Sequence, residues 1–348
     1  MLYRPHSPWT WTFLVSLLLE AGVLIALETA IYVSFITTLF PAGEASTASR
    51  VPSTSFSMII FGFLYQLLLA YDTLAKHSTP QVIGLCLYSL TLCIYNVLQY
   101  GELLESVAML IDLAAISIDM YNYTKEAMIV VAVITVTFTV WLSLVAWKLY
   151  GEFAWVAFRQ VEADLDMRRR FIYFQLFITI LKFDAFFFLG QLVQVAIMIV
   201  DALPVLFFPT IAVIPATSIL LIATGIMVRH EKRLGTIVCL PIGLYHGLRD
   251  HRILHITLLG FYLFLFTLFY KPETFTAFLP LRRILTFFGV IACLLSVCTI
   301  AMTALCLRQF GQGLKPYVSD SRKARMLGDT FELEQRGYLH VPDEEMPN

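Results

Sequence analysis

Residues 11–40 are WTFLVSLLLEAGVLIALETAIYVSFITTLF, a continuous apolar stretch in which the charged side chains are Glu20 and Glu28. A helix of about 20 apolar residues crosses a hydrocarbon core about 30 Å thick. The apolar core of a signal peptide is shorter, at about 7–15 residues. The stretch therefore predicts a membrane-spanning helix that is retained in the mature protein.

The rest of the chain has the same apolar character. Of its 348 residues, 59% are hydrophobic and 14% are charged, whereas a soluble domain carries about 25% charged residues. Backbone polar groups in hydrocarbon must be satisfied internally, so only helices and closed barrels span membranes. Barrel strands alternate apolar and polar residues, and these runs do not. The sequence predicts an all-α fold, a polytopic transmembrane helix bundle.

We expect eight spans, with seven and nine as the alternatives. They lie at 11–40, 58–74, 81–100, 127–148, 171–200, 204–228, 253–270 and 284–307. Residues 11–307 thus form the transmembrane domain, between a short segment at 1–10 and a polar tail at 308–348 that we expect to be largely disordered. Pro204, Pro209 and Pro215 predict that the helix at 204–228 is kinked or broken.

Residues 101–120 are ambiguous because they are apolar except for four acids. These are Glu102, Glu105, Asp112 and Asp119, which share about 100° of arc on a helix. Such a helix either lies in the membrane interface or spans the bilayer with its acidic stripe turned inward. Because only Gly101 separates it from the preceding span, the interfacial interpretation is favoured.

Positive charge predicts the orientation. Eight spans put both termini on one side, and placing that side in the cytosol gives it 18 of the 24 Lys and Arg residues. Five face the lumen and Lys182 lies within the membrane. Cytosolic loops are enriched in Lys and Arg, so we expect residues 1–10 and the tail to be cytosolic. If 101–120 spanned the membrane, only the N-terminus would change side.

The span at 171–200 carries polar side chains on two faces. Gln175 and Lys182 are seven residues apart and share one face, while Asp184 and Gln191 share a nearly opposite face. A helix with polar stripes on both sides has no face suited to lipid. We therefore expect this helix to lie centrally in the bundle.

Charged residues at membrane depth are costly and indicate functional sites by default. Here they are Glu20, Glu28, Lys182 and Asp184. Residues two apart point about 200° apart on a helix, so Asp184 cannot partner Lys182. Glu20, at a matching predicted depth, is the expected partner. Two interpretations stay open, namely structural contacts between helices and an ion- or proton-coupled pathway.

Motifs for catalysis or metal binding are weak. His251 and His255 form an HxxxH pattern, but no carboxylate cluster completes a ligand set, so we interpret them as interfacial residues. The six cysteines include no CxxC pair and are interpreted as buried packing residues. We predict no metal, no cofactor, no catalytic residues and, at a net charge of −1, no binding to nucleic acid.

Two short surface patterns remain. Asn122-Tyr123-Thr124 is an N-glycosylation sequon in the predicted lumenal segment, but it lies so close to the next span that we expect Asn122 to stay unmodified. In the tail, Tyr338 and Val341 fit the pattern that cytosolic sorting adaptors bind. The predicted partners are therefore the lipid bilayer and such adaptors, and the oligomeric state stays open.

Three stretches together resemble a known family. They are WKLYGEFAW at 147–155, the run at 174–190 that contains LKFDAFFFLG, and FGQGLKPY at 310–317. They resemble a fungal family of uncharacterised multi-pass Golgi apparatus membrane proteins. The resemblance implies a Golgi or related endomembrane location, and it carries over no substrate and no catalytic residue.

The leading functional interpretation is a multi-pass endomembrane protein of unknown molecular activity, not an enzyme. One alternative is an ion or small-molecule transporter or channel that uses Glu20, Lys182 and Asp184. Another is a trafficking or scaffold protein that acts through its cytosolic loops and tail. Removal of the intramembrane charges should abolish the first activity, and deletion of the tail should abolish the second.

Overall fold

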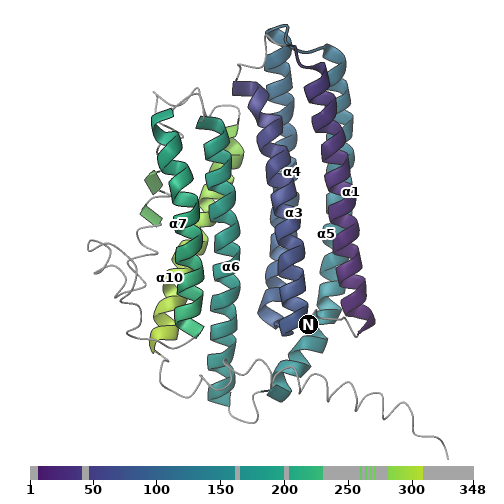
Figure 1. Cartoon of the computed structure of the whole chain (residues 1–348). Helices are drawn as coiled ribbons and strands as arrows, with labels where there is room; N and C mark the ends of the chain where they lie inside the picture. Colours follow the sequence, from purple (N-terminus) through teal and green to yellow (C-terminus); the bar gives the residue numbers. More distant parts are fainter. Residues whose placement is uncertain are drawn as a thin grey trace, which may run out of the picture.

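The computed structural model describes residues 7–40, 47–160, 165–199, 204–229 and 281–308, with isolated residues between 259 and 270. These residues are almost entirely helical, which confirms the all-α class (Figure 1). The elements are α1 (Pro8–Thr38), the short 3-10 helix η1 (Thr47–Ser49), α3 (Arg50–Lys76), α4 (Thr79–Asp112), α5 (Ile118–Gln160), α6 (Leu165–Ile199), α7 (Pro204–Arg229) and α10 (Arg282–Arg308).

Six of these helices are long and apolar enough to cross a membrane: α1, α3, α4, α5, α6 and α10. The chain is thus a multi-pass membrane protein. The predicted span at 204–228 corresponds to α7, whose apolar part within the described residues is Thr210–Ile219. The predicted span at 253–270 falls largely outside the described residues.

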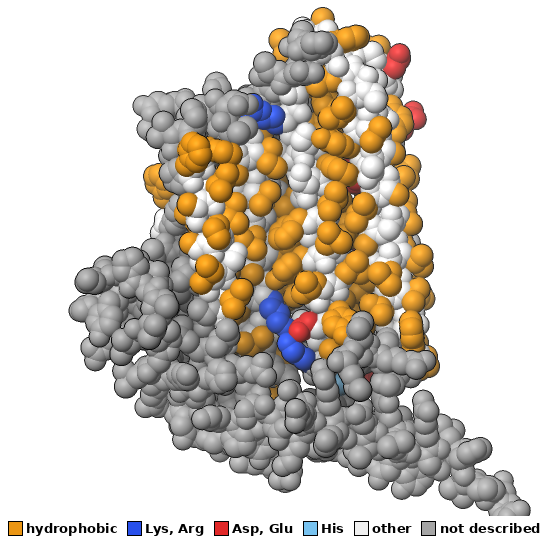
Figure 2. Space-filling model, in the orientation of Figure 1, with side chains coloured by type: hydrophobic (Ala, Val, Ile, Leu, Met, Phe, Trp, Pro, Cys, Tyr) orange, Lys and Arg blue, Asp and Glu red, His pale blue; other side chains and the backbone are white. Residues whose placement is uncertain are grey.

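The helices run side by side in two groups (Figure 1). One group contains α1, α3, α4 and α5, and the other contains α6, α7 and α10. Contacts of α6 with both α3 and α4 join the groups. On the face drawn in Figure 2, hydrophobic side chains cover most of the height of the bundle, as expected for a surface in contact with lipid.

The prediction that the helix at 171–200 is central is confirmed. As α6, it contacts α3 and α4 in one group and α7 and α10 in its own. The small Gly190 of α6 lets Met58 of α3 and Phe288 of α10 approach closely. Neighbours therefore occupy several sides of α6.

An aromatic cluster fills the junction between the two groups. The Phe186 ring on α6 lies 5.3 Å from Phe61, 5.4 Å from Tyr65 and 4.8 Å from Tyr88, measured between centroids. The ring of Phe186 is fully buried. Aromatic pairs at these separations stabilise a core by about 0.5–1.5 kcal/mol beyond their buried area, so the cluster anchors α6 to α3 and α4.

The prediction of a separate interfacial helix at 101–120 is wrong. Helix α4 continues through Gly101 without a break and ends at Asp112. A positive φ of 52° at Ala114 then reverses the chain, and α5 begins at Ile118. Glycine alone does not end a helix when packing favours continuation, and the buried Leu103 extends the packed face of α4 beyond Gly101.

The four acids that we predicted to form one stripe differ in burial and lie on two helices. Glu102 is buried, whereas Glu105 and Asp112 are exposed on the same helix. Asp119 belongs to the first turn of α5. The four acids therefore do not form one common surface.

The three prolines of 204–228 do not break their helix. Pro204 begins α7, where its missing N–H costs nothing, and α7 then continues to Arg229. The alternative of a broken helix is therefore wrong.

Close packing of α4 against α6 predicts the effect of one methyl group. A Cβ added at Gly84 would overlap the buried Phe183 ring and lie 3.3 Å from Cγ2 of Thr179. We expect Gly84→Ala to destabilise the bundle by about 1–3 kcal/mol through overpacking, as measured by thermal unfolding in detergent. The control is Gly22→Ala, because nothing lies within 4 Å of a Cβ at Gly22. Equal stability of the two variants would contradict the packing of α4 on α6.

Candidate functional site

Helix α4 carries a row of buried polar side chains, which we call the α4 seam. They occupy about 140° of the helix circumference and extend over about 32 Å of its axis, which matches the thickness of the hydrocarbon core. All are buried among neighbouring helices. The α4 seam consists of Gln81, Tyr88, Ser89, Tyr95, Asn96, Gln99 and Glu102.

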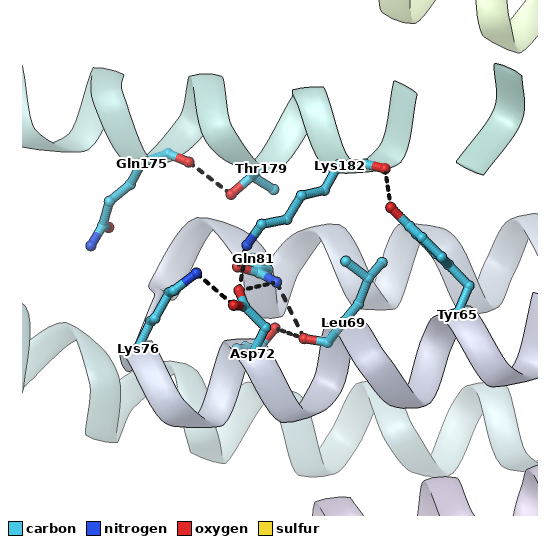
Figure 3. Close-up of polar contacts among 9 residues, drawn as sticks. Tyr65, Leu69, Asp72, Lys76, Gln81, Gln175, Thr179 and Lys182 are labelled. Atoms are coloured by element: carbon cyan, nitrogen blue, oxygen red, sulfur yellow. Dashed lines mark hydrogen bonds and ion pairs between the residues drawn. The ribbon is translucent and has the colours of Figure 1, made fainter. Parts of the chain in front are cut away.

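At one end, the seam joins an ion-pair cluster formed by α3, α4 and α6 (Figure 3). Lys182 of α6 pairs with Asp72 of α3 and donates to Oε1 of Gln81 at 2.9 Å. Nε2 of Gln81 donates to Asp72 and to the Leu69 carbonyl oxygen, both at 3.2 Å. Lys76 donates to the other oxygen of Asp72 at 2.5 Å. Three helices are thus fastened through one carboxylate.

The expectation that Lys182 pairs with a carboxylate from another helix is confirmed, but Glu20 as its partner is wrong. Helix α6 starts at Leu165, before the predicted span begins. Lys182 lies beside Asp72, in the last turns of α3, and pairs with it there. The Tyr65 hydroxyl also donates to the Lys182 carbonyl oxygen at 2.6 Å, which fixes α6 against α3 (Figure 3).

Gln175 lies on the same side of α6 as Lys182 but does not join the cluster drawn in Figure 3. Its carbonyl oxygen accepts a hydrogen bond of 2.8 Å from the Thr179 hydroxyl. Its side chain points away from Asp72 in that view. The predicted role of Gln175 in an intramembrane polar site therefore stays a prediction.

Higher on the seam, Glu20 contacts an amide instead of a cation. Nε2 of Gln66 lies 3.5 Å from Oε2 of Glu20 and donates to Ser89 at 2.9 Å. Nearby, the Tyr88 hydroxyl donates to the Gly62 carbonyl oxygen at 2.8 Å. These bonds connect α1, α3 and α4 in the interior of the bundle.

Glu28 has the same kind of partner, farther along the seam. Nε2 of Gln99 lies 3.1 Å from both carboxylate oxygens of Glu28, which joins α4 to α1. Asn96 donates to the Thr135 hydroxyl at 2.8 Å, which joins α4 to α5. In the same region, the Tyr95 hydroxyl lies 3.5 Å from the Ser55 carbonyl oxygen on α3.

The other end of the seam meets the start of α10. The Ile284 backbone N–H donates to Oε1 of Glu102 at 3.0 Å. The first N–H groups of a helix lack partners within it, and a carboxylate there is favoured by the helix dipole. Outside the seam, the exposed Glu105 pairs with Arg283 at 3.4 Å. Glu102 therefore holds α10 to α4.

The arrangement separates two kinds of charged group. Ion pairs lie toward the ends, as in Asp72–Lys182 and Glu105–Arg283. Between them, the described contacts of Glu20, Glu28 and Glu102 come from amide groups and a backbone N–H. Buried carboxyl groups of α1 and α4 thus lie at successive positions along the seam.

The second polar face of α6 faces α10, as its near-opposite position to Lys182 predicts. Oδ2 of Asp184 accepts a hydrogen bond of 3.0 Å from the Thr299 hydroxyl. Nε2 of Gln191 donates to the Leu285 carbonyl oxygen at 3.3 Å. These residues are remote in sequence but share one helix interface.

The remaining predicted residues are peripheral or lie outside the described residues. Asn122 is exposed on the first turns of α5, and Thr124 of its sequon is buried, so its unmodified state stays a prediction. The tail residues Tyr338 and Val341 fall outside the described residues, as do His251 and His255. Within the described ranges, no group of three or more His, Cys, Asp or Glu residues is arranged to hold a metal ion.

Membrane-length helices around a buried polar seam define the class, a polytopic helical membrane protein. In particular, the chain is similar to a protein of Schizosaccharomyces pombe described as a UPF0658 Golgi apparatus membrane protein. The two are 24% identical over 284 residues, which cover 76% of this chain and 77% of the relative. No family model and no solved structure matches the chain.

The comparison confirms the resemblance predicted from 147–155, 174–190 and 310–317. It supports a multi-pass protein of the Golgi membrane. The relative's name states a location and no chemical activity.

The ion-pair cluster predicts an asymmetry between two lysines that contact one carboxylate. The Lys182 and Asp72 side chains are about three-quarters buried, whereas Lys76 is 56% exposed. We expect Lys182→Met to lower the free energy of unfolding by an amount between two limits. Loss of an exposed ion pair costs roughly 1 kcal/mol, and removal of one partner of a buried pair costs roughly 3–5 kcal/mol. Lys76→Met should cost less than about 1 kcal/mol.

Thermal unfolding of the purified protein in detergent measures both effects. The double variant Lys182→Met/Asp72→Leu should recover part of the loss, because no buried charge is then left unpaired and Lys76 is exposed. If Lys182→Met and Lys76→Met were equally stable, Lys182 would not be the principal partner of Asp72.

Proposed function

We propose that the chain is a proton transporter of the Golgi membrane, not an enzyme, and that three buried carboxyl groups along the α4 seam, those of Glu20 and Glu28 on α1 and Glu102 on α4, carry the protons. One observation supports this proposal: Glu20, Glu28 and Glu102 are buried at successive depths with amide or backbone partners. A charged residue at the centre of a membrane helix costs about 2.5–3.5 kcal/mol on insertion. Amides or hydroxyls would join the helices at lower cost, so the carboxyls indicate a role that needs exchangeable protons.

Two alternatives predict different behaviour. Hydrogen bonds between helices also stabilise membrane bundles, and a purely structural seam would tolerate Gln in place of each Glu. A trafficking or scaffold protein would depend on the cytosolic tail at 308–348, which contains Tyr338 and Val341. The transport proposal requires the carboxyls and is indifferent to the tail.

We further propose eight spans with both termini in the cytosol. The bonds Asp184–Thr299 and Gln191–Leu285 make α6 and α10 antiparallel. The four residues 200–203 separate α6 from α7, and so short a connection favours antiparallel neighbours. Helices α7 and α10 then run in the same direction, which supports a further crossing of the chain between Arg229 and Arg282.

Basic residues support the direction of this topology. The ends of α3 and α5 and the start of α6 contribute Lys76, Lys148 and Arg170, and Figure 1 places these three helix ends together. Because Lys and Arg are enriched in cytosolic loops, we assign that end of the bundle to the cytosol. The opposite end contains the start of α10 and faces the Golgi lumen.

Topology is testable with a tag placed after Asn348. In sealed Golgi vesicles, external protease should remove the tag without detergent, because a cytosolic tail is accessible from outside. A second tag inserted between 41 and 46 should be cleaved only after detergent is added. Protection of the Asn348 tag in intact vesicles, with cleavage after detergent, would contradict the orientation.

Proton transport is testable in liposomes that contain the purified full-length protein and a trapped pH-sensitive dye. We expect proton flux above that of protein-free liposomes, and we expect Glu28→Gln to reduce it to that background. Gln keeps a hydrogen-bonding side chain at this site but exchanges no proton at neutral pH. The control is Glu105→Gln, since Glu105 is exposed outside the seam, and it should keep the wild-type flux.

Deletion of 309–348 separates transport from scaffolding. The truncated protein should retain full flux in liposomes if the seam carries the activity. If Glu20→Gln, Glu28→Gln and Glu102→Gln each kept the wild-type proton flux, these carboxyl groups would not carry protons, and their role would be structural. Absence of flux from the wild-type protein would refute proton transport.

A further inference from the structure

The contact between α6 and α10 contains a second set of buried polar side chains, separate from the α4 seam. Asp184 and Gln191 contribute from α6, and Ser296 and Thr299 contribute from α10. Asp184, Ser296 and Thr299 are completely buried, and Gln191 is 1% exposed. This interface lies on the other side of α6 from Lys182 and its ion-pair cluster.

Several polar atoms of this interface have no hydrogen-bond partner within the part of the chain that is described. They are Oδ1 of Asp184, Oε1 of Gln191 and Oγ of Ser296, and both side-chain polar atoms of Gln194, farther along α6, are also buried without a partner. Buried polar groups are nearly always satisfied by protein, water or a bound ion. Inside hydrocarbon, a carboxylate oxygen in a dry and unpartnered state is especially unfavourable. These atoms therefore point to a ligand that fills the interface.

The geometry brings the unpartnered atoms to one side of each helix. Ser296 precedes Thr299 by three residues, so the two hydroxyls share a face of α10, and Thr299 already bonds Asp184. The two helices are antiparallel, so a residue that precedes Thr299 on α10 lies nearer to the later residues of α6. Ser296 is therefore displaced from Thr299 toward Gln191. The polar positions on α6 from Asp184 to Gln194 extend over about 15 Å, toward the end of α6 at Ile199.

We propose that this interface binds one small monovalent cation at Asp184, with Ser296 and Thr299 as further oxygen ligands. Carboxylate, hydroxyl and amide oxygens suit a hard cation. A single buried carboxylate balances a single positive charge, whereas a divalent ion would remain uncompensated. Gln191 lies two turns from Asp184 along α6, toward Ile199.

The neighbouring hydroxyl of Thr303 provides an internal contrast. It is as deeply buried as Ser296 and lies on the same side of α10. Its hydroxyl already donates to the Thr299 carbonyl oxygen at 2.7 Å. Thr303 is therefore a matched position outside the proposed ligand set.

Sodium binding to the purified full-length protein in lipid nanodiscs tests the proposal. Radiolabelled Na⁺ should bind to a single saturable class of sites, with choline chloride holding the ionic strength constant. Asp184→Asn should abolish saturable binding. Ser296→Ala should weaken it about tenfold, the effect of losing one ligand worth about one hydrogen bond. Thr303→Ala should bind as the wild type does.

This inference goes beyond the proposed proton transport, and its outcome is independent of that proposal because binding is measured without flux. If Asp184→Asn does not fold, Ser296→Ala keeps the carboxylate and still tests the site. Absence of saturable Na⁺ binding in the wild-type protein would overturn the proposal and leave water as the occupant. Unchanged affinity in Ser296→Ala, or equal weakening in Thr303→Ala, would overturn the assigned ligands.

Discussion

Hydrogen bonds across the buried face of α4 are the interaction on which the rest of the structure depends. A hydrocarbon core offers no water to polar side chains, so buried polar groups are stabilised by partners inside the bundle. From Gln81 to Glu102, successive seam positions reach α3, α6, α5, α1 and finally α10. One helix thus contacts five others through polar groups, and apolar packing fills the spaces between these contacts.

The kind of partner changes along the seam, and this change relates the fold to the proposed function. A full ion pair, Asp72–Lys182, fastens three helices where the side chains are still partly accessible. Farther inside, Glu20 and Glu28 have amide partners. Ion pairs fix a geometry because separating them leaves a charge unpaired. Carboxyls with neutral partners are free of that restraint and suit groups that exchange protons.

Sequence alone predicted the features that depend on local composition. The length of apolar runs predicted the membrane helices, and the two polar faces of 171–200 predicted that α6 is central. Contacts between side chains of different helices could not be predicted in the same way. Glu28 and Gln99, for example, lie on different helices, and no local sequence pattern connects them. The pair of Lys182 with Asp72 was missed for the same reason, because Asp72 lies on α3. A boundary placed at Gly101 concealed the continuation of α4 and the buried position of Glu102.

The most direct test of this account is the coupling free energy between Glu28 and Gln99. It is obtained from the unfolding of Glu28→Ala, Gln99→Ala and the double variant relative to the wild type in bicelles. The account predicts a favourable coupling of about 0.6–1.7 kcal/mol, the range of hydrogen bonds between membrane helices. Additive effects of the two substitutions would contradict the claim that the α4 seam holds the bundle together.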